Sequence, residues 1–267
     1  MQCTLLSPNR LFNHPSRSRA PPLLRSYLIM SPPRGEKRPR TAVKATGDGR
    51  FANLFEAFQS IGEEMKDYDE KREIVIKKSR DIQKQSKQAI FSVHRGDIAQ
   101  ANTRLEAALA GYDELIPVIT ETPGLRHGSF SNAMEEYAEA KIFLTFHESK
   151  TLLVPADLPQ TNTDEYLGGL LDFTGELNRW AVIQATSRQV DDVKLARDCV
   201  DAVLSVMMEL DLRNGSIRKK YDSLKYCLKN LEKVLYELSL GQDVGLNINA
   251  EKVGADGPER ETANADD

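Results

Sequence analysis

The chain has 267 residues, of which 40% are hydrophobic and 28% charged, so it has enough apolar side chains for a globular core and is not a disordered chain. No apolar stretch approaches the ~20 residues needed to cross a bilayer, which excludes a membrane-spanning protein. Three widely spaced cysteines without a CxxC pair argue against a disulfide framework and against a thiolate zinc site.

The net charge of −4 is unevenly distributed along the chain. Residues 1–50 carry ten Arg and Lys against two acidic residues, and they contain seven prolines and no helical periodicity, so we expect them to be disordered. Beyond a plain basic tail, two interpretations stay open: an organellar transit peptide over residues 1–35, and a nuclear-import patch at residues 37–40. The expected location is the cytoplasm and nucleus, with an organelle as the alternative.

Apolar residues recur at helical spacing from residue 51 to residue 241. The pattern predicts six helices, over about 51–94, 98–119, 130–151, 164–188, 190–212 and 216–240. Helix-terminal chemistry suggests Asp164 as an N-cap, Asn214-Gly215 as the stop of the fifth helix, and Gly241 as the stop of the sixth. No run of alternating β-branched residues competes, so we expect an all-α fold: a single antiparallel bundle of about six to seven helices over 51–241, with an acidic disordered tail over 242–267.

Two pairs of carboxylates stand at helical spacing, Glu136 with Glu139 and Asp172 with Glu176. Solvated helix faces are the commoner origin of such pairs. The predicted fourth helix, however, also contains three glycines, each costing ~1 kcal/mol relative to alanine, which suggests that another backbone approaches it closely. Those glycines are Gly168, Gly169 and Gly175. Four converging carboxylates would need a cation, and hard oxygen ligands suit Mg²⁺ or, alternatively, Mn²⁺, which would equip the site for phosphodiester hydrolysis.

Basic residues at helical spacing follow the first and sixth predicted helices, and they would contact several phosphates if they lined one groove. The candidate nucleic-acid-binding residues are Lys77, Lys78, Arg80, Lys84, Lys87 and Arg95 in the first helix and Arg218, Lys219 and Lys220 in the sixth. Nearby aromatic side chains, Phe91, Tyr221 and Tyr226, could stack on unpaired bases. Because acidic residues interleave with the basic ones, a solvated charged face is the alternative.

Three segments form a specific combination of motifs: SRDI at 79–82, EYAEA at 136–140 and DFTGELNR at 172–179. Together they resemble the translin family, most closely its translin-associated factor X members, over about residues 51–240. The resemblance implies a helical bundle that assembles into a closed octameric shell and a Mg²⁺-dependent endoribonuclease acting on single-stranded RNA. Its implied catalytic and metal-binding acids are Glu136, Glu139, Asp172 and Glu176, and Glu136 is the expected residue to orient or deprotonate the attacking water. Removal of a nicked passenger strand in RNA silencing and trimming of transfer-RNA fragments are the implied roles.

Residues 212–226 are more similar to translin itself than to its associated factor, which keeps several partners open. The chain would join a translin-like subunit in a hetero-octamer or form a homo-oligomer with itself. Single-stranded RNA is the expected ligand, with single-stranded DNA as an alternative and no membrane partner. Two non-enzymatic readings also stand: a single-stranded DNA/RNA-binding subunit without catalysis, and a structural helical adaptor.

Overall fold

The structure, a computed structural model, describes residues 52–252, with side-chain environments for 52–240. Its elements are α1 (Ala52–His94), α2 (Ile98–Glu121), the 3₁₀ turn η1 (Pro123–Arg126), α3 (Ser129–Ser149), the 3₁₀ turn η2 (Pro155–Asp157), α4 (Thr163–Thr186), α5 (Val190–Met208) and α6 (Ser216–Lys252). No strand occurs within 52–252, so the all-α prediction is confirmed. None of the helices in this range combines the length and apolarity that a bilayer crossing requires. The predictions for residues 1–50 and for the last residues of the acidic tail lie outside the described range.

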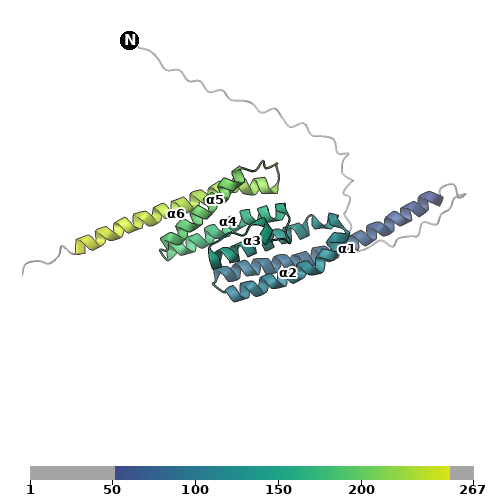
Figure 1. Ribbon diagram of the computed structural model, residues 1–267, viewed down its shortest axis with the longest axis horizontal. Helices are drawn as coiled ribbons and strands as arrows, with labels where there is room; N and C mark the ends of the chain where they lie inside the picture. Colours follow the sequence, from purple (N-terminus) through teal and green to yellow (C-terminus); the bar gives the residue numbers. More distant parts are fainter. Residues whose placement is uncertain (1–51, 253–267) are drawn as a thin grey trace, which may run out of the picture. The chain divides into compact units, whose positions relative to one another are not determined.

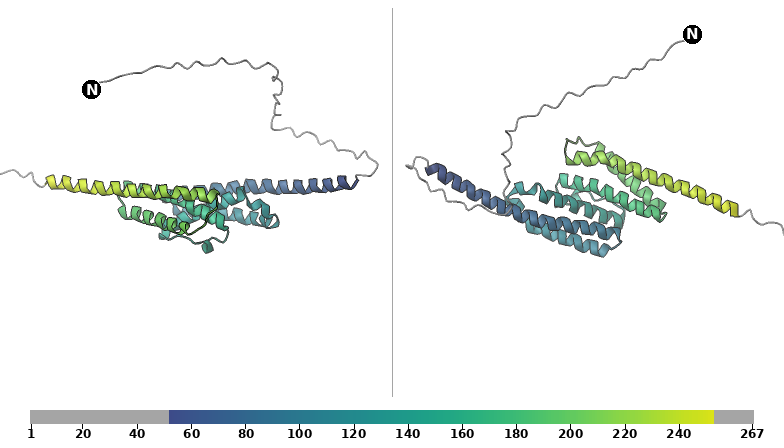
Figure 2. Two further views of the ribbon diagram at one scale, coloured as in Figure 1. Left: turned by 90° about the horizontal axis from the view of Figure 1, so that it is seen from above. Right: turned by 180° about the vertical axis from the view of Figure 1, so that it is seen from behind.

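The helical bundle belongs to a compact unit that begins at Glu56. Helices α3 and α4 lie in the middle of the bundle, with the α1–α2 hairpin on one side and α5 and α6 on the other (Figures 1 and 2). The central position of α3 follows from its sequence, because Ala138, Ala140, Ile142, Phe143 and Leu144 are all fully buried and cover every side of the helix. An aromatic cluster at the core joins α3 to α4.

Three predicted helix boundaries are wrong. Asn162, not Asp164, caps α4: its side chain accepts a hydrogen bond from the Glu165 amide, and the Asn162 amide donates one to the Glu165 carboxylate, which completes a capping box. Helix α5 ends at Met208, before the predicted stop at Asn214-Gly215, because Met207 is the last of its buried residues. Helix α6 continues through Gly241 and Gly245 to Lys252, since each glycine costs a helix only ~1 kcal/mol and no proline lies in this stretch.

Two of the three α4 glycines permit the close approach of α3 that the sequence suggests. A Cβ at Gly169 would lie 2.7 Å from the Ala138 Cβ and 2.7 Å from the Glu135 carbonyl oxygen, and a Cβ at Gly168 would overlap the Glu135 side chain. Around Gly175 nothing lies within 4 Å, so the expectation of a close approach is wrong there. The two adjacent glycines therefore set how near α4 can bring its carboxylates to those of α3.

We expect Gly169→Ala to lower the free energy of unfolding by about 1–3 kcal/mol, because the added methyl group meets backbone atoms of α3 that cannot move aside without separating the helices. The matched variant Gly175→Ala, in open space on the same helix, should raise it by about 0.5–1 kcal/mol through helix propensity. Urea denaturation of the two variants measures both effects. Equal effects of the two substitutions would contradict the role assigned to Gly169.

Candidate active site

The α3–α4 contact brings the two predicted carboxylate pairs together. Glu136, Glu139 and Glu176 line one pocket of ≈ 290 Å³, whose other walls come from Lys87, Ile90 and Phe91 of α1 and Arg179 of α4. Asp172 lies one turn before Glu176 on α4 and acts electrostatically on Glu139, although it does not line the pocket. Four acidic groups from two helices thus share one small region of the bundle.

Glu139 is the most buried of the four acids, with only 8% of its surface exposed. Burial raises the pKa of Glu139 to about 8, and the charges of Asp172, Glu136 and Glu176 add to the rise while Lys220 opposes it. A carboxyl group among like charges is easier to protonate than to ionise. At neutral pH Glu139 is therefore largely a carboxylic acid, because of its burial first and of its acidic neighbours second.

Two lysines neutralise part of this charge. The Lys87 ammonium lies 3.0 Å from a Glu136 carboxylate oxygen, which also accepts a 3.3 Å hydrogen bond from Gln83 Nε2. From α6, the Lys220 ammonium donates to both Asp172 and Glu135. Burial acts to lower the pKa of Lys220, but its hydrogen bonds to the two carboxylates outweigh burial and raise it. Lys220 is thus a charged counter-ion inside the acidic region.

His94, at the end of α1, is a site residue that the sequence reasoning did not assign. Its Nε2 donates a 2.5 Å hydrogen bond to Glu176, and this bond is the main reason why the pKa of Glu176 is lowered. The imidazole packs on the Phe143 ring at 4.8 Å between centroids, and its Nδ1 is buried without a hydrogen-bond partner among the described residues. One signal could have identified it: His94 lies four residues after the buried Ile90, on the same face of α1.

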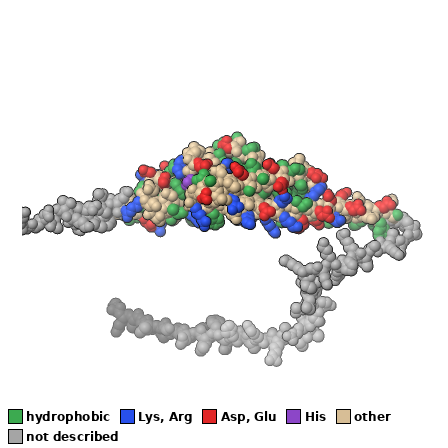
Figure 3. All heavy atoms as spheres, turned by 90° about the horizontal axis from the view of Figure 1, so that it is seen from below, with side chains coloured by type: hydrophobic (Ala, Val, Ile, Leu, Met, Phe, Trp, Pro, Cys, Tyr) green, Lys and Arg blue, Asp and Glu red, His purple; other side chains and the backbone are tan. Residues whose placement is uncertain are grey.

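The structure places the predicted basic residues on two helices, α1 and α6. Helices α1 and α6 flank α3 and α4 in the view of Figure 1, and Figure 3 shows Lys and Arg side chains along the lower edge of the molecule with acidic side chains between and above them. Lys87 and Lys220 reach the acidic region, whereas Lys78 pairs with Glu114 and Arg218 with Asp222. The remaining candidates are exposed on α1 or α6: Lys77, Arg80, Lys84, Arg95 and Lys219.

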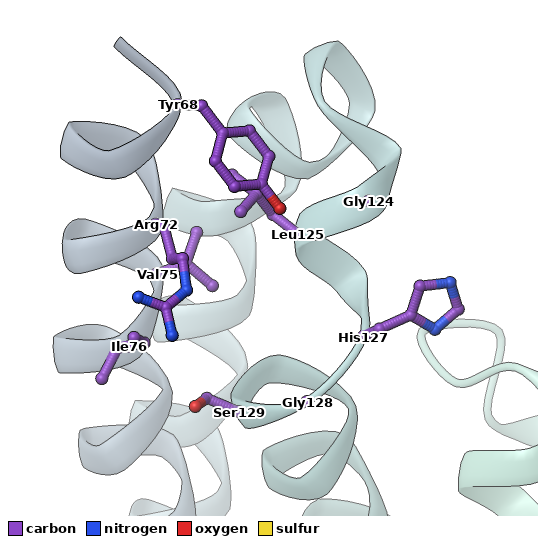
Figure 4. Close-up of a pocket in the computed structure, with 9 residues that line it drawn as sticks. All are labelled: Tyr68, Arg72, Val75, Ile76, Gly124, Leu125, His127, Gly128 and Ser129. Carbon is purple, nitrogen blue, oxygen red and sulfur yellow. The ribbon is translucent and has the colours of Figure 1, made fainter. Parts of the chain in front are cut away.

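A separate pocket of ≈ 150 Å³ lies between α1 and the segment from η1 to the start of α3. Tyr68 and Arg72 of α1 point into it, toward Leu125 and Ser129, while the His127 ring turns away from α1 (Figure 4). Its two basic side chains therefore do not converge on one point.

The acidic region has the donor chemistry of a Mg²⁺ or Mn²⁺ site but not a finished ligand cage. Within residues 52–252, no group of three or more His, Cys, Asp and Glu side chains is already arranged around a common metal position. The four carboxylates nevertheless offer the hard oxygen ligands that such cations prefer, and Asp172, Glu136 and Glu176 lie close enough to Glu139 to add to the rise in its pKa that burial causes. These carboxylates can hold the ion if the Lys220 ammonium releases Asp172 and Glu139 loses its proton.

The buried acid makes the stability of the metal-free protein depend on pH. Between the ordinary pKa of a glutamate and about 8, the folded state holds a proton on Glu139 that the unfolded state has released, so the free energy of unfolding falls as pH rises. We expect this fall between pH 5 and pH 8 in EDTA to be markedly smaller in Glu139→Gln, which keeps a neutral side chain at every pH. Urea denaturation at the two pH values tests this, and identical pH dependence in both proteins would contradict the burial of an ionisable group here.

Comparisons with known proteins identify relatives over most of the bundle. A family model described as the Translin family matches residues 70–242. Chicken translin is 34% identical over 97 residues, which is 36% of this chain and 40% of translin, so the match spans well under half of that relative's length. Translin-associated protein X from rat is 24% identical over 225 residues, covering 69% of this chain and 78% of the relative. The homologue of that protein in Schizosaccharomyces pombe is 29% identical over 154 residues, 52% of this chain and 66% of the relative.

Two solved structures share the fold. One, described as apo-NeC3PO, superimposes with a TM-score of 0.63 at 20% identity and covers 68% of this chain and 96% of the other. The second is a complex of AfC3PO with duplex RNA, with a TM-score of 0.61 at 19% identity, covering 69% of this chain and 97% of the other. At these identities the likeness concerns the arrangement of helices.

Proposed function

The chain belongs to the translin family, and on that premise we propose that it is a Mg²⁺-dependent endoribonuclease subunit that binds and cleaves single-stranded RNA within a translin-type oligomer. The observation that carries the proposal is the cluster of Glu136, Glu139, Asp172 and Glu176 at the α3–α4 contact, where burial first, and the three acidic neighbours second, raise the pKa of Glu139. Such a cluster is unfavourable unless a cation or proton neutralises it. An anionic substrate would need the same neutralisation.

Each residue of the pocket has a proposed task. The four carboxylates hold Mg²⁺ or Mn²⁺, which when bound supplies electrophilic stabilisation of the charge that develops on the phosphate. Glu136 orients the attacking water and accepts its proton, while Lys87 holds this carboxylate in place. His94 fixes the rotamer of Glu176 through its hydrogen bond, and Arg179 offers a positive charge to the RNA backbone.

The proposed ligand and partners follow from the same family membership. Among the similar structures, one is a complex with duplex RNA, which supports a nucleic acid as the ligand of this chain. Single-stranded RNA is the favoured form, because unpaired bases could stack on the exposed Phe91 ring at the edge of the pocket. The assembly would contain either a translin-like subunit or further copies of this chain.

A second function is favoured by one contact. Lys220 occupies Asp172 and Glu135 with its own ammonium group, so the acidic region is partly neutralised without any metal. If that contact persists with RNA bound, the chain would be a non-catalytic subunit that binds single-stranded RNA or DNA. Its affinity would then fall steeply with salt and would not depend on Mg²⁺.

Cleavage of a fluorescently labelled single-stranded RNA by the purified full chain separates the two functions. The reaction is run with Mg²⁺ and with EDTA, for the chain alone and together with a translin subunit. We expect products only with Mg²⁺. RNA binding without cleavage in both preparations would overturn the nuclease proposal and favour the binding subunit.

A further inference from the structure

A second polar pocket adjoins the acidic one at the turn between α1 and α2, and we call it the flanking pocket. Its volume is ≈ 360 Å³, within the range of small-ligand sites. It is lined by Gln88, Phe91, Ser92, Arg95, Asp97, Gln100 and Arg104. Phe91 also lines the acidic pocket, so its ring forms a wall common to both. A flexible ligand that fills one pocket can therefore continue past Phe91 into the other.

The flanking pocket carries basic charge. Arg95 and Arg104 face a single acid, Asp97, which is already engaged as the N-cap of α2, where it accepts a 3.0 Å hydrogen bond from the Gln100 amide. Arg104 is half-buried and is held by a 3.0 Å hydrogen bond from its Nη1 to Gln85 Oε1, which fixes the guanidinium against α1. Guanidinium groups placed in this way are suited to the oxygens of a phosphate.

Two further features of the pocket fit a nucleotide rather than a simple anion. The Phe91 ring is 54% exposed although it is apolar, and the Arg179 guanidinium lies 5.7 Å from its centroid. Gln88 has a side-chain oxygen that is buried and has no hydrogen-bond partner within the described part of the chain. An exposed aromatic face accepts a base by stacking, and a buried acceptor without a donor suits an amino or hydroxyl group of a nucleoside.

We propose that the flanking pocket binds a nucleotide of single-stranded RNA next to the one cleaved in the acidic pocket. The base stacks on Phe91, Arg95 and Arg104 hold its phosphate, and the Gln88 oxygen accepts a hydrogen bond from the nucleoside. A base in a duplex is covered by its neighbours in the stack, so this mode of binding requires an unpaired strand. The position of this nucleotide beside the cleaved one rests on the proposed nuclease function, whereas the affinity of the pocket for RNA does not.

Fluorescence anisotropy of a labelled single-stranded RNA tests the flanking pocket in EDTA, where no cleavage takes place. Phe91→Leu should weaken binding by about 10-fold without changing the salt dependence, because it removes stacking and no charge. Arg104→Gln should reduce the slope of log affinity against log salt by about 0.7, the value for one lost phosphate contact on a single strand. Arg104→Lys should restore the slope.

A matched control is Arg197→Gln on α5, which removes the same charge from an arginine paired with Asp198 outside the pocket. It should leave affinity and slope as in the wild type. If Arg104→Gln and Phe91→Leu bind RNA no differently from this control, the flanking pocket is not an RNA site. If the two variants bind RNA like the control while the wild type cleaves it, the flanking pocket is not an RNA site and the proposed nuclease function stands. If the two variants lose affinity as expected but the wild type never cleaves RNA, the flanking pocket stands and the nuclease function does not.

Discussion

Replacing Glu139 with glutamine is expected to slow Mg²⁺-dependent RNA cleavage by at least about 100-fold, the size of effect seen when a charged group acting in the transition state is lost. Glu139 lies at the centre of the acidic region, since Asp172, Glu136 and Glu176 all act on its pKa. Glutamine has nearly the same shape but cannot become a carboxylate. The folded structure and the RNA-binding surface should therefore persist while the metal site loses one ligand charge.

Single-turnover cleavage and RNA affinity are measured in parallel, so that loss of chemistry is separated from loss of binding. Glu148→Gln is the matched control, because it makes the same substitution at an exposed position of α3 away from the acidic pocket. Asp172→Asn should behave like Glu139→Gln and should in addition release Lys220 from one of its two partners. Undiminished cleavage by Glu139→Gln would contradict the assignment of these acids as metal ligands.

Much of the fold is accessible from the sequence because each helix buries a continuous apolar face. The close contact of α3 and α4 is predictable as well, since adjacent glycines within a helix are costly unless another backbone uses the space, as at Gly168 and Gly169. Helix ends are less accessible. The N-cap at Asn162 depends on the reciprocal bond from Glu165, and the end of α5 depends on where the core stops, which helix spacing does not reveal.

The acids of the candidate site can be selected from spacing on single helices, but their partners cannot. His94 meets Glu176 across 82 residues, and Lys220 meets Asp172 across 48 residues and Glu135 across 85. Helical periodicity relates residues three or four positions apart, so it carries no information on such pairs. For the same reason Lys220 is predicted as an RNA contact among the other lysines of α6, although the fold turns it toward carboxylates.

Breaking the ion pair between Arg126 and Glu165 is expected to lower the free energy of unfolding by about 3–5 kcal/mol, the usual loss when one partner of a buried pair is removed. The Glu165 side chain is fully buried, and its two oxygens lie 2.6 Å and 3.2 Å from Arg126 nitrogens. Arg126 also donates a 3.1 Å hydrogen bond to the Gln160 carbonyl, so it ties η1 to the loop that leads into α4. Arg126→Met leaves the Glu165 charge in the interior without this partner.

Urea denaturation of Arg126→Met, Glu165→Gln and the double variant measures the coupling between the two residues. The double variant should be more stable than the sum of the single losses implies, because it leaves no unpaired charge. Asn162→Ala serves as the control: it removes the cap of α4 but not the ion pair and should cost about 1 kcal/mol. If Arg126→Met costs no more than this control, the pair does not anchor the start of α4. If it costs the expected amount, the pair is a main support of the helix that places Asp172 and Glu176 opposite α3.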